Sequence, residues 1–213
     1  MELSVAGVGL SYDGQPVLEN VSFALEGQGK ALLLGPSGSG KSSLINVITG
    51  LQTPDSGDVT LGDQRVSGSG GDSVRRRSMG IIFQTLRLVS ALSVRANLLL
   101  AQRLQTGAQD TALVDATLAQ LGIADRAHAR PFELSQGEAQ RAAIARALVV
   151  KPALIIADEP TSALDAANTE RVAQLLIEVS EQAGASLLVA THDDRLKPYF
   201  ERSMTLSQGN LAA

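Results

Sequence analysis

No cysteine occurs among the 213 residues of this chain. That absence excludes a disulfide framework, a thiolate metal site and a cysteine nucleophile. No apolar run approaches the roughly 18 residues that a membrane span requires. The N-terminal segment 1–4 has neither a basic nor an apolar stretch, so we expect no secretory signal. These absences predict a cytoplasmic chain, and any role at a membrane would come through a partner.

An excess of positive charge is also lacking. The net charge is −4, and the basic residues are scattered rather than arranged in a stripe, which argues against nucleic acid as a partner. The only basic cluster is Arg75-Arg76-Arg77, for which we expect a solvated turn. No repeat or low-complexity tract is present. The length fits one domain, or a core with one sizeable insertion.

The chain does contain a phosphate-binding pattern. An apolar run at 30–34 leads into the Walker A string G-x-x-x-x-G-K-S, and the stretch 43–48 that follows has a helical pattern. The backbone N–H groups of such a loop face inward and cradle phosphates, and the helix adds its positive N-terminal dipole. In this pattern Lys41 reaches the β- and γ-phosphates, and the Ser42 hydroxyl ligates Mg²⁺.

The alternative interpretation is a glycine-rich turn that matches by coincidence. Average residue usage puts a chance match at this length on the order of 1%, and the flanking strand and helix lower it further. The pattern therefore predicts nucleoside triphosphate binding. The predicted contacts are Gly35, Pro36, Ser37, Gly38, Ser39, Gly40, Lys41, Ser42 and Ser43.

The hydrophobic pattern predicts an α/β fold. Short strands at 8–12 and 17–25, around a turn at Asp13-Gly14, indicate an N-terminal antiparallel β layer. Continuous apolar strands separated by a helix imply a parallel sheet that is covered on both faces. From about 86 to 150 the apolar spacing is helical. The later strands are expected at 79–83, 153–157 and 186–190, with a helix at 166–182 that Asp165 caps.

Two adjacent carboxylates, Asp158 and Glu159, follow the apolar strand that ends at 157. An α/β fold places its ligand at this end of its strands. Asp158 suits the shell of a Mg²⁺ ion, and Glu159 can polarise an attacking water molecule. A solvated acidic turn is the alternative, but the nearby phosphate loop favours the catalytic interpretation.

The string Ser135-Gln136-Gly137-Glu138 has the form of a capping box, with Ser at the N-cap and Glu at N3. It predicts a helix over 137–150. The longer string 134–141, Leu-Ser-x-Gly-Glu-x-Gln-Arg, lies some twenty residues before the paired carboxylates. With that spacing, the chain resembles the ATP-binding subunits of ABC transporters. The resemblance implies that Ser135 and the N–H groups of this helix contact the γ-phosphate held by the other subunit.

The resemblance covers essentially the whole chain, and it implies a role for several single residues. Tyr12 matches the aromatic residue that stacks on adenine, Gln84 matches the glutamine that senses Mg²⁺ and water, and His192 matches the switch histidine at the γ-phosphate. The loop 162–165 would cross the dimer interface. The implied catalytic residues are Glu159, His192 and Gln84; the metal ligands are Ser42, Gln84 and Asp158 (Walker B); and the further ATP contacts are Tyr12, Ser135, Gly137, Glu138 and Asp165.

The resemblance also implies a domain organisation. It predicts one ATP-binding domain over 1–213, a P-loop NTPase (RecA-like) α/β core with the antiparallel β layer at 1–85 and 150–213, and an inserted α-helical subdomain at 86–149. One position departs from the family pattern, because Gln136 stands where glycine is usual. The sequence leaves open whether this side chain points outward or narrows the site.

The implied partners are a second copy, or a homologous ATPase subunit, and an integral-membrane permease at the cytoplasmic face of the inner membrane. ATP and Mg²⁺ are the implied cofactors. The runs 76–84 and 138–148 are most similar to the branch of lipoprotein-release, macrolide-export and cell-division cassettes. The alternative within that branch is an ATPase that regulates a non-transporting membrane partner. ABC ATPases of DNA repair or translation are disfavoured, because the chain has no coiled coil, zinc-binding cysteines or second cassette.

Overall fold

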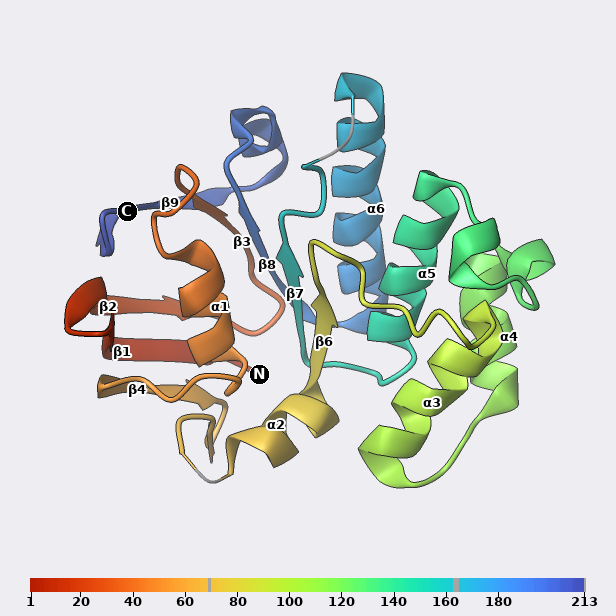
Figure 1. Ribbon diagram of the computed structural model, residues 1–213, viewed down its shortest axis with the longest axis horizontal. Coiled ribbons are helices and arrows are strands. Elements are labelled where there is room, and N and C mark those ends of the chain that lie inside the picture. Colours follow the sequence, from red (N-terminus) through yellow and green to blue (C-terminus); the bar gives the residue numbers. More distant parts are fainter. Residues whose placement is uncertain (69, 163–164, 213) are drawn as a thin grey trace.

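The computed structural model describes residues 1–68, 70–162 and 165–212. Its strands form two sheets (Figure 1). One is antiparallel, with four strands in the order β2-β1-β4-β5; the other has six strands in the order β10-β9-β3-β8-β7-β6, of which β9 to β6 are parallel. The strands are β1 (Leu3–Tyr12), β2 (Gln15–Leu25), β3 (Lys30–Leu34), β4 (Ser56–Leu61), β5 (Gln64–Arg65), β6 (Met79–Ile82), β7 (Leu154–Asp158), β8 (Ser186–Thr191), β9 (Arg202–Ser207) and β10 (Asn210–Ala212).

The helices lie on both sides of the parallel sheet (Figure 1). α1 packs between the two sheets, whereas α3 to α6 cover the opposite face. The α-helices are α1 (Lys41–Ile48), α2 (Gly71–Ser78), α3 (Val94–Thr106), α4 (Thr111–Gln120), α5 (Gln136–Leu148) and α6 (Ala166–Ala183), and the 3-10 helices are η1 (Ala124–Arg126), η2 (Pro131–Glu133) and η3 (Asp194–Tyr199).

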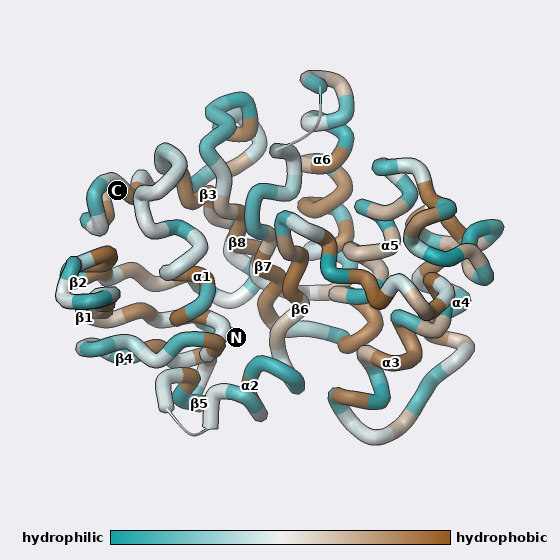
Figure 2. Tube along the Cα trace, viewed as in Figure 1, coloured by the Kyte–Doolittle hydropathy of each residue, from teal (hydrophilic) through white to brown (hydrophobic). Residues whose placement is uncertain are grey.

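The two faces of the sheet explain the continuous apolar strands. Side chains alternate across a strand, so in β3 Leu33 joins the core with α1, while Leu32 and Leu34 join the core with the other helices. Both cores need apolar residues, so every position of β3 from Ala31 to Leu34 is apolar. The central strands are accordingly brown over their middle residues in the hydropathy view (Figure 2). The predicted fold class, with its N-terminal antiparallel layer and its parallel sheet covered on both faces, is confirmed.

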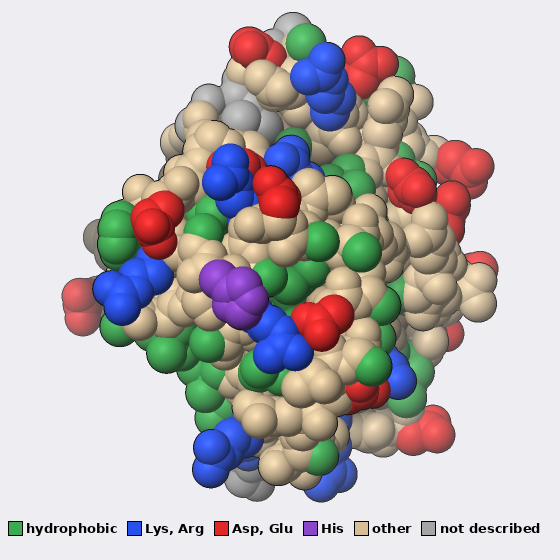
Figure 3. All heavy atoms as spheres, turned by 90° about the vertical axis from the view of Figure 1, so that its right-hand side faces the viewer, with side chains coloured by type: hydrophobic (Ala, Val, Ile, Leu, Met, Phe, Trp, Pro, Cys, Tyr) green, Lys and Arg blue, Asp and Glu red, His purple; other side chains and the backbone are tan. Residues whose placement is uncertain are grey.

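The helical segment between β6 and β7 shares its core with the sheet. α5 packs against β6, and its Ala142, Ile144 and Ala145 are buried in the same cluster as Leu32 and Leu34. Figure 3 shows acidic and basic side chains interspersed on the face of the molecule that α3 and α4 help to form. The boundaries 86–149 for a separate subdomain stay a prediction.

The expectation of a solvated turn at Arg75-Arg76-Arg77 is corrected in part, because these residues form the last turn of α2, where Arg76 and Arg77 are exposed but Arg75 is not. The Arg75 side chain is only 19% exposed and donates to the carbonyl oxygens of Thr49 and Gly50 at 3.3 and 3.4 Å. It therefore stabilises the C-terminal end of α1. The serine- and glycine-rich run 67–71 predicts a flexible loop, but Gly71 already begins α2; Ser69 lies outside the described residues.

Candidate functional site

The phosphate loop lies between β3 and α1. Gly40 is the N-cap of α1 with φ 103°, and within the described chain no side chain caps this helix, so its first N–H groups remain available for an anion. A Cβ at Gly40 would lie 2.9 Å from the Val17 carbonyl oxygen, and one at Gly35 would lie 2.3 Å from the Leu206 carbonyl oxygen. The close backbone approach therefore requires glycine at both ends of the loop.

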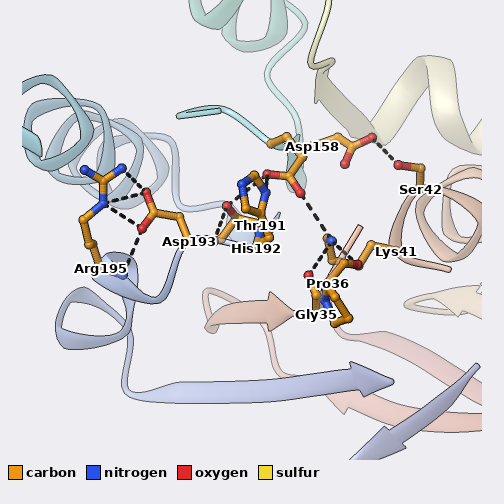
Figure 4. Close-up of polar contacts among 10 residues, drawn as sticks. Gly35, Pro36, Lys41, Ser42, Asp158, Thr191, His192, Asp193 and Arg195 are labelled. Carbon is orange, nitrogen blue, oxygen red and sulfur yellow. Dashed lines mark hydrogen bonds and ion pairs between the residues drawn. The ribbon is translucent and has the colours of Figure 1, made fainter. Parts of the chain in front are cut away.

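Lys41 lies at the centre of this loop, and its side chain is 6% exposed. Its Nζ donates to the carbonyl oxygens of Gly35 at 2.7 Å and Pro36 at 3.2 Å and lies 3.3 Å from Glu159 Oε1 (Figure 4). Three oxygens thus surround one buried ammonium group. The position suits a phosphate oxygen, because a doubly or triply charged anion interacts more strongly with the ammonium than two carbonyl dipoles do.

Glu159 is held where β7 and β8 end side by side. Its φ of 48° is in the left-handed region, where a non-glycine residue is unusual and costs on the order of 1 kcal/mol. Its N–H donates to the Ala190 carbonyl oxygen at 2.8 Å. Its Oε2 accepts from Thr191 Oγ1 at 3.1 Å and lies 2.8 Å from His192 Nδ1 (Figure 4). A strained backbone with a 10% exposed carboxylate marks a functional position.

Asp158 is the second carboxylate. Ser42 Oγ donates to its Oδ2 at 3.1 Å, whereas its Oδ1 is buried without a hydrogen-bond partner among the described residues. Burial raises the pKa of Asp158, the charge of Glu159 adds to that effect, and the Ser42 hydrogen bond and Lys41 oppose it. A cation beside Asp158 would relieve this penalty, so the residues fit a Mg²⁺ ion.

The rest of a Mg²⁺ shell would come from other groups. Among the described residues, no set of three or more His, Cys, Asp or Glu side chains is arranged to hold a metal. Mg²⁺ typically takes one or two protein ligands and completes its octahedron with phosphate oxygens and water. The pair of Ser42 and Asp158 has that character, with Gln84 on the wall of the same cavity.

A cavity of about 430 Å³ opens over the phosphate loop. It brings together most of the predicted residues from opposite ends of the chain. Tyr12, at the end of β1, is 44% exposed there, so its ring face is accessible to a flat ligand. The lining residues are Tyr12, Val17, Ser37, Gly38, Gly40, Lys41, Ser42, Ser43, Gln84, Glu159 and His192. Of the other loop residues, Gly35 and Pro36 hold Lys41, and Ser39 is buried with its hydroxyl unpaired among described residues.

The residues at the start of α5 do not join this cavity. Ser135 and Gly137 line a separate one, between α5 and α6. The capping box is present, since Ser135 Oγ accepts from the Glu138 N–H and the Glu138 carboxylate accepts from the Ser135 N–H. This backbone bond, the Ser135 hydroxyl and Arg126 lower the pKa of Glu138 to about 2. Its contribution to stability is therefore complete above the ordinary pKa near 4.5 and is lost as the pH falls towards 2.

Asp165 also lies apart from the cavity over the phosphate loop. It is the N-cap of α6 and accepts from the Asn168 N–H at 2.8 Å. This confirms the predicted cap, while its contact with ATP stays a prediction. Of the predicted loop at 162–165, residues 163 and 164 lie outside the described residues.

Two residues at the cavity went unnoticed in the sequence. Val17 adds an apolar wall beside Tyr12, and its only signal in the sequence is its place three residues after the turn at Asp13-Gly14. Thr191 fixes Glu159, and it directly precedes His192. The turn after His192 is held by Asp193, whose carboxylate accepts from Arg195 at 2.6 to 3.0 Å and whose pKa is lowered by that pair.

Comparison with known proteins agrees with this geometry. A family profile described as "ABC transporter" matches residues 18–162. The lipoprotein-releasing system ATP-binding protein LolD of Hydrogenovibrio crunogenus is 38% identical over 200 residues, which cover 92% of this chain and 87% of that protein. An uncharacterised ABC transporter ATP-binding protein of Mycobacterium tuberculosis is 39% identical over 92% of this chain and 81% of its own length.

Solved structures show the same architecture. The ATP-binding cassette MJ0796, in a dimeric post-hydrolysis state bound to ADP and Pi, superposes with a TM-score of 0.89 at 30% identity, covering 99% of this chain and 97% of that chain. A cassette of the cbiONQ ABC transporter complex of Clostridium perfringens has a TM-score of 0.89 at 28% identity, covering 99% and 86%. In the part of the chain that the structure describes, no helix is long and apolar enough to cross a membrane.

Proposed function

Because this chain belongs to the ABC transporter family and is an ATP-hydrolysing subunit of that family, we propose that two copies close head to tail around two ATP molecules and drive a separate membrane permease. The observation that carries this proposal is the separation of the two candidate phosphate-binding surfaces. Lys41 lines one cavity and Ser135 lines another. A twofold arrangement lets the Ser135 surface of each copy complete the site of the other.

Within each site we assign one task to each group. Tyr12 and Val17 hold the adenine ring by stacking and apolar contact. The loop N–H groups and Lys41 bind the β- and γ-phosphates. Ser42, Asp158 and Gln84 would hold Mg²⁺, which supplies charge neutralisation at the phosphates when it is bound.

Glu159 is the proposed general base. When ATP draws Lys41 onto the phosphates, Glu159 Oε1 loses its ammonium partner at 3.3 Å and can accept a hydrogen bond from the attacking water. Thr191 and His192 keep Oε2 fixed meanwhile. His192 is half-exposed and is assigned to the γ-phosphate.

A mixture of two inactive variants tests the composite site. Ser135→Arg should bind ATP as a monomer but lose hydrolysis, because the bulky side chain obstructs the proposed interface; Lys41→Ala should lose hydrolysis for lack of ATP binding. Each heterodimer of the two variants has one competent site of two. Because random pairing in an equal mixture makes about half of the dimers heterodimers, the mixture should recover up to about a quarter of the wild-type rate. Ser203→Arg, on an exposed position of β9, is the matched control and should remain active.

Concentration dependence provides the second measurement. Without the permease, two free copies must meet before either hydrolyses ATP, so specific activity should rise with protein concentration and then level off. No recovery in the mixture, together with constant specific activity from a proven monomer, would contradict the composite site.

We place the permease contact on a groove beside Gln84, and with it the chain on the cytoplasmic face of the inner membrane. A cavity of about 230 Å³ lies between α2, β6, α3 and α5. Met79, Ile81 and Phe83 line it, and Leu104 on its rim is 62% exposed. Phe83 directly precedes Gln84. A movement of Gln84 when the bound nucleotide changes would therefore be transmitted through Phe83 to a partner bound in this groove. Val89, six residues after Phe83 in the chain, is 43% exposed, and we include the stretch 86–92 around it in the proposed contact.

The basic side chains of this groove indicate the chemistry of the partner segment. Arg75, Arg76 and Arg146 line the same groove; Arg75 is already paired with Asp72, and no acidic side chain lines the groove among the described residues. Arg146 is fixed by bonds to the carbonyl oxygens of Arg87 and Ile81. A short segment with one apolar face and acidic flanks would complement this surface.

Single cysteines test the groove cleanly, because the chain has none of its own. Leu104→Cys and Val89→Cys should crosslink to a membrane protein in cells, whereas Gln174→Cys, on an exposed position of α6, should not. The readout is a higher-mass band in the membrane fraction. If neither groove cysteine ever forms such a band in an otherwise active protein, the assignment is wrong.

A further inference from the structure

A second cavity, of about 350 Å³, lies between the N-terminal halves of α5 and α6. No residue of its wall also lines the cavity over the phosphate loop. Ser135 and Gly137 belong to the ATP contacts that the family resemblance implies, whereas that resemblance implies no role for the α6 side of this wall. The lining residues are Ser135, Gln136, Gly137, Gln140, Arg141, Asn168, Arg171, Val172 and Leu175.

The charge of this wall is uncompensated. Arg141 and Arg171 both line it, and no acidic side chain does among the described residues. Neither arginine forms an ion pair with any part of the chain that the structure describes. The Nε of Arg141 is buried without a hydrogen-bond partner there. Two guanidinium groups on one cavity without a counter-charge favour an anionic occupant.

A buried amide adds a second donor that lacks a partner. Gln140, one turn into α5, is only 7% exposed, and its Nε2 makes no hydrogen bond within the described residues. A buried donor that is left unpaired costs free energy. An occupant with acceptor oxygens would satisfy it together with Arg141.

The start of α5 contributes its own field. The helix has 13 residues, so its aligned dipoles place partial positive charge at Gln136 and Gly137. A Cβ added at Gly137 would lie 3.5 Å from Nη1 of Arg141, which shows that this guanidinium lies against the first turn of the helix. Arginine, amide and helix N-terminus therefore converge on one side of the cavity, and Arg171 of α6 lies on the other.

We propose that this cavity binds a small oxyanion, phosphate or carboxylate, between α5 and α6. An oxyanion has several acceptor oxygens, and so it can contact both arginines and Gln140 at once. Inorganic phosphate, the product of this ATPase, is one source; a carboxylate metabolite is another with the same chemistry. Binding would link the Ser135 helix to the helix that follows Asp165, and so fix their relative position.

The test uses the full chain with Lys41→Ala, so that the phosphate loop contributes little phosphate binding of its own. Unfolding temperature is measured in sodium phosphate, sodium citrate and sodium chloride at equal ionic strength and pH. We expect phosphate or citrate to raise the unfolding temperature by on the order of a few degrees above chloride. Adding Arg171→Gln should remove at least half of that rise.

Arg103→Gln in the same background is the matched control, because Arg103 is exposed on α3 and the substitution changes the net charge equally. It should leave the rise intact. The salt that produces the Arg171-dependent rise identifies the source. No rise in either salt, a rise that survives Arg171→Gln, or an equal loss in Arg103→Gln overturns the proposal. If instead Lys41→Ala still binds ATP, the phosphate-loop assignment fails, while the dependence on Arg171 can still be measured.

Discussion

Glu159→Gln should retain ATP binding and hydrolyse ATP more slowly by about 10²- to 10⁴-fold, the usual contribution of a general base. The amide preserves the shape of the side chain and can still accept from Thr191 Oγ1, which lies 3.1 Å away in the wild type. It cannot accept a proton from water. Because hydrolysis opens the proposed dimer, this variant should accumulate as an ATP-bound dimer.

Steady-state phosphate release and size-exclusion chromatography with ATP measure both effects. Glu201→Gln, on an exposed position before β9, is the matched control and should match the wild type in both. Near-normal turnover in Glu159→Gln would assign the base to another group, with His192 the next candidate, since its Nδ1 lies 2.8 Å from this carboxylate.

The order of residues along the chain predicts the parts of the site that depend on local spacing. The loop from Gly35 to Ser42 needs a strand before it and a helix after it, and both are present. Asp158 ends β7 as expected. The capping box of Ser135 and Glu138 forms as its three-residue spacing predicts. In each case the interacting groups are neighbours in sequence, so the pattern alone specifies the geometry.

Contacts across the fold are harder to predict. The left-handed backbone of Glu159 arises because its N–H reaches Ala190 on the neighbouring strand, and no local pattern encodes that bond. The run Arg75-Arg76-Arg77 predicts solvated side chains, yet Arg75 donates to carbonyl oxygens at the end of α1. β9 has only two buried side chains, Met204 and Leu206, so its hydrophobic signal is too short to distinguish a strand from a loop.

The cavity between α5 and α6 is likewise formed by contacts across the fold that the sequence pattern does not predict. Arg141 and Arg171 are thirty residues apart, on two helices whose packing the sequence pattern does not specify. Each arginine alone is typical of a solvated helix face. Only the fold shows that they line one cavity with the buried amide of Gln140.

Lys41→Ala should abolish detectable ATP binding. In the cavity over the phosphate loop Lys41 is the only lysine or arginine that lines the wall among the described residues, and its side chain is 6% exposed. Hydrogen bonds to charged groups contribute about 1.5–3 kcal/mol each, so loss of two such bonds to phosphate oxygens weakens binding by on the order of 10²-fold or more. The dipole of α1 and the loop N–H groups remain, but they carry only partial charges.

The substitution also changes the protein itself. Glu159 loses the ammonium at 3.3 Å yet keeps Thr191 and His192 as partners, so we expect the variant to fold. Circular dichroism and a fluorescent ATP-analogue titration measure the two effects. Lys151→Ala, an exposed position before β7, is the control and should bind as the wild type does. Lys41→Arg should also bind weakly, because the planar guanidinium is larger than an ammonium and cannot fit between the Gly35 and Pro36 carbonyl oxygens in the same way. Wild-type affinity for Mg-ATP in folded Lys41→Ala would exclude this loop as the phosphate site.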